Sequence, residues 1–129
     1  MSLLLDTNTL LWSVHDPRSL SPRARNLISS PDQELYVSAV TAVELSIKVR
    51  LGKLPAVGMA IVDYLPWALP QLGALPLAFS LEHGAEVERL PRHHRDPFDW
   101  MLIAQARVEG LTLVTNDRKI RLYDVQTVW

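Results

Sequence analysis

Short apolar runs alternate with helix-like patterns along the first half of the chain. Residues 3 to 5 form a continuous apolar run typical of a buried strand, and residues 7 to 15 then place apolar side chains on one helical face. The same succession returns when residues 35 to 40 predict a strand and residues 41 to 51 predict a helix that ends at Gly52. This repetition indicates strand-to-helix units.

Similar signals continue toward the C-terminus, with one segment left unassigned. Within residues 55–73, the stretch 61–69 has helical spacing, but Pro66 and Pro70 are expected to kink or end a helix. Because parallel strands are joined by crossover helices, the alternation predicts an α/β fold with a central parallel sheet flanked by α-helices. Further helices are predicted at 22–30, 80–90 and 97–110, and further strands at 75–78, 111–114 and 125–128.

Length and composition narrow the possibilities. Neither a repeat nor a linker divides the 129 residues, so we expect a single domain over 1–129. The chain has no cysteine, so any metal must be held by oxygen or imidazole. The apolar start is interrupted at Asp6, so we expect neither a signal peptide nor a membrane span. A cytoplasmic location is therefore expected. The net charge of −1 gives no overall attraction to a polyanion.

Four acidic residues stand where predicted strands end or predicted helices begin: Asp6, Glu44, Asp99 and Asp117. Because ligands bind beyond the carboxyl ends of parallel strands, we expect these four side chains to share one cleft. Each acid also has a structural explanation when it is taken alone. Asp6 can cap a helix, Thr41 with Glu44 matches a capping box, and Asp117 follows a turn-like Thr-Asn.

The sequence Asp-Pro-Phe-Asp at 96–99 holds two acids for one of these positions. Asp96 fits a helix cap followed by proline, and Asp99 fits the third helical position. One of the two acids can therefore be structural and the other functional.

Clustered carboxylates favour a divalent metal site. Several acids in one cleft repel one another and raise their pKa values unless cations neutralise them. Oxygen ligands, without cysteine or a His-x-x-x-His pair, favour Mg²⁺ or Mn²⁺ over zinc. Such a site can activate water and stabilise a departing phosphate oxygen, which predicts phosphodiester hydrolysis. We expect Asp6 and Asp99 to be direct metal ligands, while Glu44 and Asp117 act through water or on a second ion.

Four motifs follow one another over nearly the whole chain. They are LLDTN at 4–8, VELSIK at 43–48 with GKL at 52–54, HRDPFDWMLIAQA at 94–106 and LVTND at 113–117. In order and spacing, the chain resembles the PIN-domain ribonucleases, and specifically the VapC-type toxins of bacterial and archaeal toxin–antitoxin pairs. The resemblance implies a PIN-like three-layer fold.

The resemblance also implies roles for individual residues. Asp6, Glu44, Asp99 and Asp117 become the four catalytic acids in chain order, and Asp96 is an acid that often accompanies the third. The polar neighbours that would orient carboxylates or water are Thr7, Asn8, Thr115 and Asn116. Trp100 departs from the pattern, because relatives frequently carry a basic residue at that position.

Partners and substrate enter through the same resemblance. It implies a homodimer, a small VapB-type antitoxin that covers the acidic site, and cleavage of structured RNA such as transfer RNA. The intact set of acids favours an active metal-dependent endoribonuclease. Two alternatives stay open on the sequence alone: a PIN-fold binding module without nuclease activity, and a housekeeping PIN nuclease without an antitoxin.

Other polar and aromatic groups have two explanations each. The run Arg-His-His-Arg at 92–95 and the basic residues within 48–53 and 118–121 are either phosphate contacts or solvated surface. His15 and His83 are expected at the surface or at helix ends rather than as metal ligands. Candidates for either an exposed partner-binding patch or core packing are Trp12, Tyr64, Leu65, Trp67 and Leu69.

Overall fold

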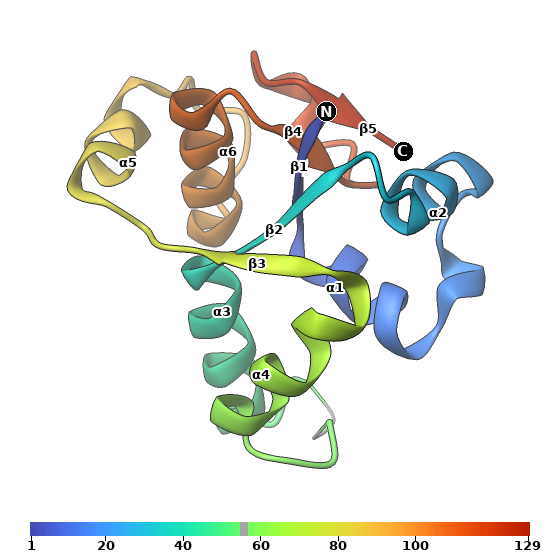
Figure 1. The fold of residues 1–129 in the computed structure, drawn as a ribbon. Helices are drawn as coiled ribbons and strands as arrows, with labels where there is room; N and C mark the ends of the chain where they lie inside the picture. Colours follow the sequence, from blue (N-terminus) through green and yellow to red (C-terminus); the bar gives the residue numbers. More distant parts are fainter. Residues whose placement is uncertain (55–56) are drawn as a thin grey trace.

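A five-stranded parallel sheet forms the centre of the molecule, in a computed structural model that describes residues 1–54 and 57–129 (Figure 1). The strand order is β3-β2-β1-β4-β5, and every neighbouring pair is parallel. The strands are β1 (Ser2–Leu5), β2 (Glu34–Ser38), β3 (Ala74–Leu77), β4 (Thr112–Val114) and β5 (Thr127–Val128). The helices are α1 (Thr7–His15), α2 (Pro22–Ser29), α3 (Ala39–Arg50), α4 (Ile61–Leu72), α5 (Leu81–Glu86) and α6 (Pro97–Glu109). The predicted α/β class with a parallel sheet is confirmed.

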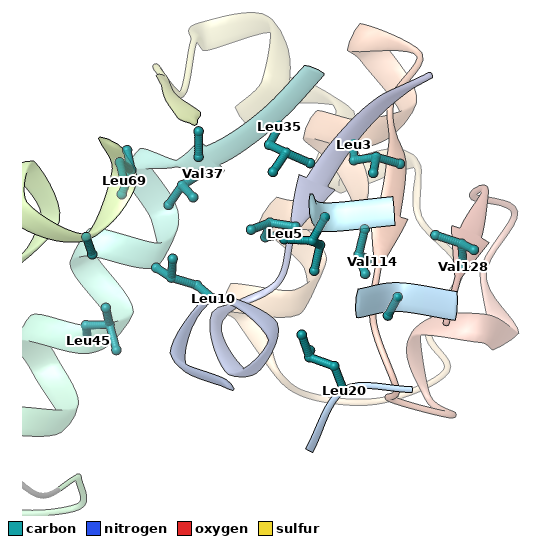
Figure 2. Close-up of a cluster of buried hydrophobic side chains, with 14 of the residues drawn as sticks. Leu3, Leu5, Leu10, Leu20, Leu35, Val37, Leu45, Leu69, Val114 and Val128 are labelled. Atoms are coloured by element: carbon teal, nitrogen blue, oxygen red, sulfur yellow. The ribbon is translucent and has the colours of Figure 1, made fainter. Parts of the chain in front are cut away.

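Two hydrophobic clusters lie on opposite faces of the sheet, as the alternation along β1 requires. Leu3 and Leu5 belong to a cluster with side chains of α1, α2 and α4 (Figure 2). Leu4 points the other way and packs with Leu102 and Ile103 of α6. All three leucines of β1 are fully buried. Helices therefore cover both faces of the sheet, which gives three layers.

The helix α4 resolves most of the segment that the sequence left unassigned. It extends from Ile61 through both Pro66 and Pro70 to Leu72, and Gly73 ends it in the left-handed conformation at φ 65°. Prolines remove backbone donors and usually break a helix. Here Tyr64 and Ala68 are completely buried on one side of the helix, and this burial outweighs the lost hydrogen bonds. Positions 55–56 of that segment lie outside the described residues.

The boundary between β2 and α3 differs from the prediction. The strand ends at Ser38 and the helix begins at Ala39, whereas the sequence pattern places the strand through 40 and the helix from 41. The Ser38 hydroxyl accepts a hydrogen bond from the backbone N–H of Val40 at 3.0 Å and so caps the helix. The predicted capping box of Thr41 and Glu44 is therefore wrong, because both residues lie inside the helix.

Two smaller expectations about helices have definite outcomes. Ser21 caps α2 by accepting from the backbone N–H of Ala24 at 3.0 Å, with proline in the first turn as predicted. The helix predicted at 80–90 is shorter, because α5 ends at Glu86 and a 3₁₀ turn follows over Val87–Arg89. Within the described ranges, no helix is long and apolar enough to cross a membrane.

Replacing Leu3 with alanine is expected to lower the free energy of unfolding by about 2–5 kcal/mol, because truncation of a buried leucine leaves a cavity. Leu81→Ala is the matched control, since that side chain is 95% exposed and its loss should change stability by less than about 0.5 kcal/mol. Urea denaturation measures both variants. Equal losses in the two would contradict the placement of Leu3 in the core.

Candidate active site

Asp6 lies where the ends of β1 and β4 are joined. Its Oδ1 atom accepts a hydrogen bond from the backbone N–H of Thr9 at 2.8 Å, so Asp6 caps α1. The Asp6 backbone N–H and the Thr9 hydroxyl both donate to the carbonyl of Val114, at 3.3 and 2.9 Å. The helix cap that the sequence allows for Asp6 is therefore real, and it also fixes the carboxylate at the edge where the strands end.

Asp117 follows β4 in a turn that its own side chain stabilises. Its Oδ1 atom accepts from the backbone N–H of Lys119 at 2.8 Å, and its backbone N–H donates to the hydroxyl of buried Thr115 at 3.0 Å. Asn116 is exposed between them. Because β1 and β4 are neighbours, this turn lies beside Asp6. The connection that leaves β1 runs to β2 on one side and the connection that leaves β4 runs to β5 on the other, and α/β folds bind their ligands at such a switch point.

Glu44 projects from the second turn of α3 and is 6% exposed. Its Oε1 atom accepts a hydrogen bond from the hydroxyl of Thr7 at 2.7 Å, and the Thr7 hydroxyl lies 3.3 Å from that of Thr41. Its Oε2 atom forms an ion pair with Lys48, one helical turn further on. Glu44 is thus the acid of the group that already has a cationic partner.

The structure separates the roles of Asp96 and Asp99. Asp96 caps α6, because its Oδ1 atom accepts from the backbone N–H groups of Phe98 at 2.9 Å and Asp99 at 3.3 Å. The Oδ2 atom of Asp99 instead lies 2.9 Å from Nε2 of His94. Asp96 therefore stabilises the helix start, while Asp99 is held by a side chain from the preceding loop.

All of these acids line a single cleft of about 250 Å³. The elements that form it approach one sheet edge, as predicted from the positions of strand ends and helix starts. The lining residues are Asp6, Thr7, Asn8, Trp12, Glu44, Lys48, Asp96, Asp99, Asn116 and Asp117. Four predicted acids are thus brought together, and Lys48 is the basic residue that shares the cleft with them.

Burial raises the pKa of the Asp6 carboxyl above its ordinary value, and the nearby charge of Asp117 adds to the effect. Hydrogen bonds from Thr9 and Thr115 act in the opposite direction. Burial disfavours the ionised form because the carboxylate loses its hydration, and a second negative charge makes this worse. A bound cation would offset both effects.

The Asp99 carboxyl behaves similarly. Burial raises its pKa to about 6, and the charges of Asp96 and Asp117 contribute, while the hydrogen bond from His94 lowers it. Raised carboxyl pKa values in a cleft are typical of functional sites. Asp117 contributes to the raised pKa of both Asp6 and Asp99, so its charge lies near both predicted metal ligands.

The donor set of the cleft suits a hard divalent cation. It offers carboxylate and amide oxygens and no thiol or imidazole, which matches the ligand preference of Mg²⁺. Among the residues that the structure describes, no three His, Asp or Glu side chains are placed to hold one ion together. Mg²⁺ commonly uses only one or two protein carboxylates and completes its shell with water and phosphate oxygens. The carboxylates of the cleft therefore fit an ion that completes its shell with ligands from outside the protein.

Comparison with known families decides what kind of domain carries this cleft. The model of the PIN domain family matches residues 3–126, which is nearly the whole chain. The chain belongs to the PIN domain family. PIN domains are a family of nucleases, and the acidic cleft lies within the matched range.

Solved structures share the fold of this PIN domain. A chain of VapBC2 from Rickettsia felis, crystallised with a promoter DNA fragment, has a TM-score of 0.72 at 17% identity over 99% of this chain and 98% of that one. DNA-bound VapBC from Salmonella typhimurium gives 0.70 at 18%, covering 99% and 97%. FitAcB from Neisseria gonorrhoeae gives 0.62 at 23%, covering 98% and 96%. Identities this low establish the PIN-like three-layer fold alone. No curated protein matched the chain.

Some residues of this PIN domain make contacts that the sequence does not indicate. His83, expected at the surface or a helix end, is at the start of α5 but only 2% exposed, and its Nε2 atom lies 2.7 Å from Glu109. Of the candidate apolar patch, Tyr64 and Leu69 are buried in the core, while Trp67 remains 45% exposed. The contact of Tyr64 with His15, at 2.8 Å, has no counterpart in the sequence pattern.

The contacts of His94 also go beyond what the sequence indicates. The run at 92–95 is a candidate for phosphate binding, yet His94 turns inward to Asp99 and to the hydroxyl of Tyr123, which lies 2.8 Å from its Nδ1 atom. Tyr123 is 29 residues away in the sequence. No local spacing signals such a pair, so only the folded PIN domain reveals it.

The Asp99→Asn variant of this PIN domain is expected to be more stable than the parent chain at about pH 7.5 without metal, by at most roughly 3 kcal/mol. A carboxyl whose pKa is raised from 3.8 to about 6 stabilises the fold while protonated, and this contribution is lost as pH rises through about 6. The advantage of the variant should therefore shrink on acidification and disappear near pH 4 (~3.8).

Urea denaturation in EDTA at several pH values measures this difference. Asp32→Asn is the matched control, because Asp32 is exposed and lies outside the cleft. A stability difference for Asp99→Asn that stays constant with pH would contradict the raised pKa.

Proposed function

We propose that this PIN domain is a divalent-metal-dependent endoribonuclease and acts as the toxin of a type II toxin–antitoxin pair. The observation that carries the proposal is the single cleft in which Asp6, Glu44, Asp99 and Asp117 meet. Family membership supports a nuclease, and the raised pKa values of two buried carboxyls support a site that takes up cations.

Asp6 and Asp99 are the residues that would hold Mg²⁺ or Mn²⁺. When bound there, the cation would neutralise the carboxylates, polarise a phosphate group and activate a water for attack. Both carboxylates are fixed before any substrate arrives, one by its helix cap and the other by His94. Pre-set ligands avoid reorganisation during the reaction.

The remaining acids have different tasks in this proposal. Asp117 adds negative charge near both metal ligands, and the backbone N–H of Lys119 holds its carboxylate in the turn after β4. Glu44, fixed by Thr7 and paired with Lys48, orients a water or receives a proton in the cleft. The Lys48 ammonium is positioned to contact a phosphate oxygen that enters beside Glu44.

Exposed basic residues next to the cleft support a nucleic-acid substrate. One group lies in the loop before α6 and another in the turn after β4, and the two segments touch where Tyr123 accepts from the backbone of His93 and His94. Within the described ranges, none of these cations forms an ion pair. The exposed basic residues are Arg92, Arg95, Arg118, Lys119 and Arg121.

Similarity to VapBC complexes and to a toxin–antitoxin complex from Klebsiella pneumoniae supports a VapB-type antitoxin as the partner. The proposal includes a homodimer, a single nuclease domain over 1–129, a cytoplasmic location and structured RNA, such as transfer RNA, as the target. In this proposal the antitoxin covers the acidic cleft and blocks cleavage until the toxin is released.

Purified chain is expected to cleave total cellular RNA with Mg²⁺ or Mn²⁺, and Asp6→Asn should reduce the rate at least about 100-fold, because it removes a charged metal ligand. Asparagine still caps a helix, so the variant should remain folded. Gel analysis of RNA with and without EDTA measures the activity.

Asp32→Asn serves as the matched control, since it removes an exposed acid away from the cleft. Cleavage that persists in EDTA or in Asp6→Asn would exclude the metal mechanism. Folded protein that binds RNA but cuts none with either ion would favour a binding module instead.

The double substitution of Arg118 and Arg121 by glutamine is expected to weaken RNA binding at all sequences and to reduce the slope of log affinity against log salt by roughly 0.7 for each phosphate that is no longer neutralised. Fluorescence anisotropy with single-stranded RNA, on an Asp6→Asn background, measures the affinity. Arg23→Gln on α2 is the control, since Arg23 is exposed and outside the cleft lining. Equal salt slopes in all three proteins would show that RNA does not contact this turn.

A further inference from the structure

A buried hydrogen-bond network stands behind Asp99. Tyr123 follows the 3₁₀ turn Ile120–Leu122 and is 4% exposed, and its hydroxyl lies 2.8 Å from Nδ1 of His94. On the other side of the ring, Nε2 of His94 lies 2.9 Å from Oδ2 of Asp99. The His94 side chain is 7% exposed. One imidazole therefore connects a buried phenol to a carboxylate of the cleft.

The surroundings of the Tyr123 oxygen determine the direction of these hydrogen bonds. It is approached by three N–H donors: the backbone N–H groups of His93 and His94 at 3.3 Å, and Nε1 of Trp100 at 3.2 Å. Two of these donors are enough to occupy its two acceptor lone pairs, so its own O–H is directed to Nδ1 of His94. Nδ1 must then accept, and the ring proton is placed on Nε2, where it donates to Asp99.

We propose that Tyr123 and His94 act as positioning residues for Asp99. They hold the His94 ring in the tautomer that carries its proton on Nε2, and this ring fixes one oxygen of Asp99 while the other stays available to the cleft. Within the described part of the chain, Oδ1 of Asp99 has no hydrogen-bond partner. The inference rests on the proposed function where it concerns RNA cleavage, but the network can be tested without it.

An uncharged donor suits this position better than a cation does. In this tautomer the imidazole donates a hydrogen bond without cancelling the carboxylate's negative charge, so Asp99 keeps its attraction for a divalent ion. Glu44 provides the contrast, because its partner Lys48 supplies a full positive charge. Of these two carboxylates, Glu44 is neutralised by a partner within the protein, whereas Asp99 is oriented but left charged.

Trp100 has a role in the same network. Its Nε1 atom donates to the backbone carbonyl of His94 at 3.1 Å and lies 3.2 Å from the Tyr123 hydroxyl. It therefore ties the loop before α6 to the segment after β4. These contacts use the Trp100 side chain inside the protein.

The first test is the tautomer itself. Nitrogen-15 NMR of the histidine rings, at a single pH above neutrality and without metal, should show His94 with a protonated Nε2 and a bare Nδ1. His94→Gln identifies the signal among the four histidines. Tyr123→Phe should mix the two tautomers, whereas Tyr36→Phe, which removes a phenol bonded to Glu34, should leave the pattern unchanged.

The second test measures Mn²⁺ affinity by calorimetry and RNA cleavage in parallel. Loss of an outer hydrogen bond typically weakens a metal site 10–100-fold, so we expect roughly that loss for His94→Leu and for Tyr123→Phe. His94→Gln, whose amide can still donate to Asp99 and accept from Tyr123, should recover most of it. In cleavage, kcat should fall while KM for RNA stays near that of the parent chain.

A His94 proton on Nδ1, or Mn²⁺ affinities unchanged in both His94→Leu and Tyr123→Phe, would overturn the inference. Circular dichroism identifies any variant that has unfolded. The inference is then tested by the Tyr123→Phe variant and by the His94 tautomer of the parent chain. Failure of the proposed function gives a different result: the tautomer and its dependence on Tyr123 would be found as described, in a protein that cuts no RNA.

Discussion

The parallel pairing of β1 between β2 and β4 is the constraint on which the rest of the structure depends. It aligns the carboxyl ends of the central strands, and the Thr9 hydroxyl with the Asp6 amide closes the gap by bonding to the Val114 carbonyl. These hydrogen bonds hold Asp6, the residue after β1, beside the turn after β4. The position of the cleft is therefore determined by the register of the central strands, and its side chains then line it.

Gathering acids in this way opposes folding. Two of the carboxyls, Asp6 and Asp99, have raised pKa values because they are buried near other negative groups, so at neutral pH their ionised forms destabilise the protein. The leucines of the sheet and the buried face of α4 supply the stability that tolerates this. Separate hydrogen bonds then fix three of the acids: the backbone N–H of Thr9 holds Asp6, the Thr7 hydroxyl holds Glu44, and the His94 ring holds Asp99.

Most of the fold, and the meeting of four acids, could be predicted from the sequence because they depend on local periodicity and on the geometry of parallel sheets. The errors have physical causes. Ser38 begins α3 earlier than Thr41 because a serine hydroxyl at the strand end is a better cap than the pattern indicates. α4 passes through Pro66 because tertiary burial outweighs a local breaker. The pairing of His94 with Tyr123 joins distant segments, and no spacing rule contains such information.

Ser38 is both the last residue of β2 and the cap of α3, so no loop separates the sheet from the helix that carries Glu44. An insertion of one residue here would rotate everything after it by about 100° around the helix axis and would aim that carboxylate elsewhere. A change of length at this junction would therefore turn Glu44 away from the cleft that it lines. The number of residues between Ser38 and Glu44 thus decides the direction in which this carboxylate points.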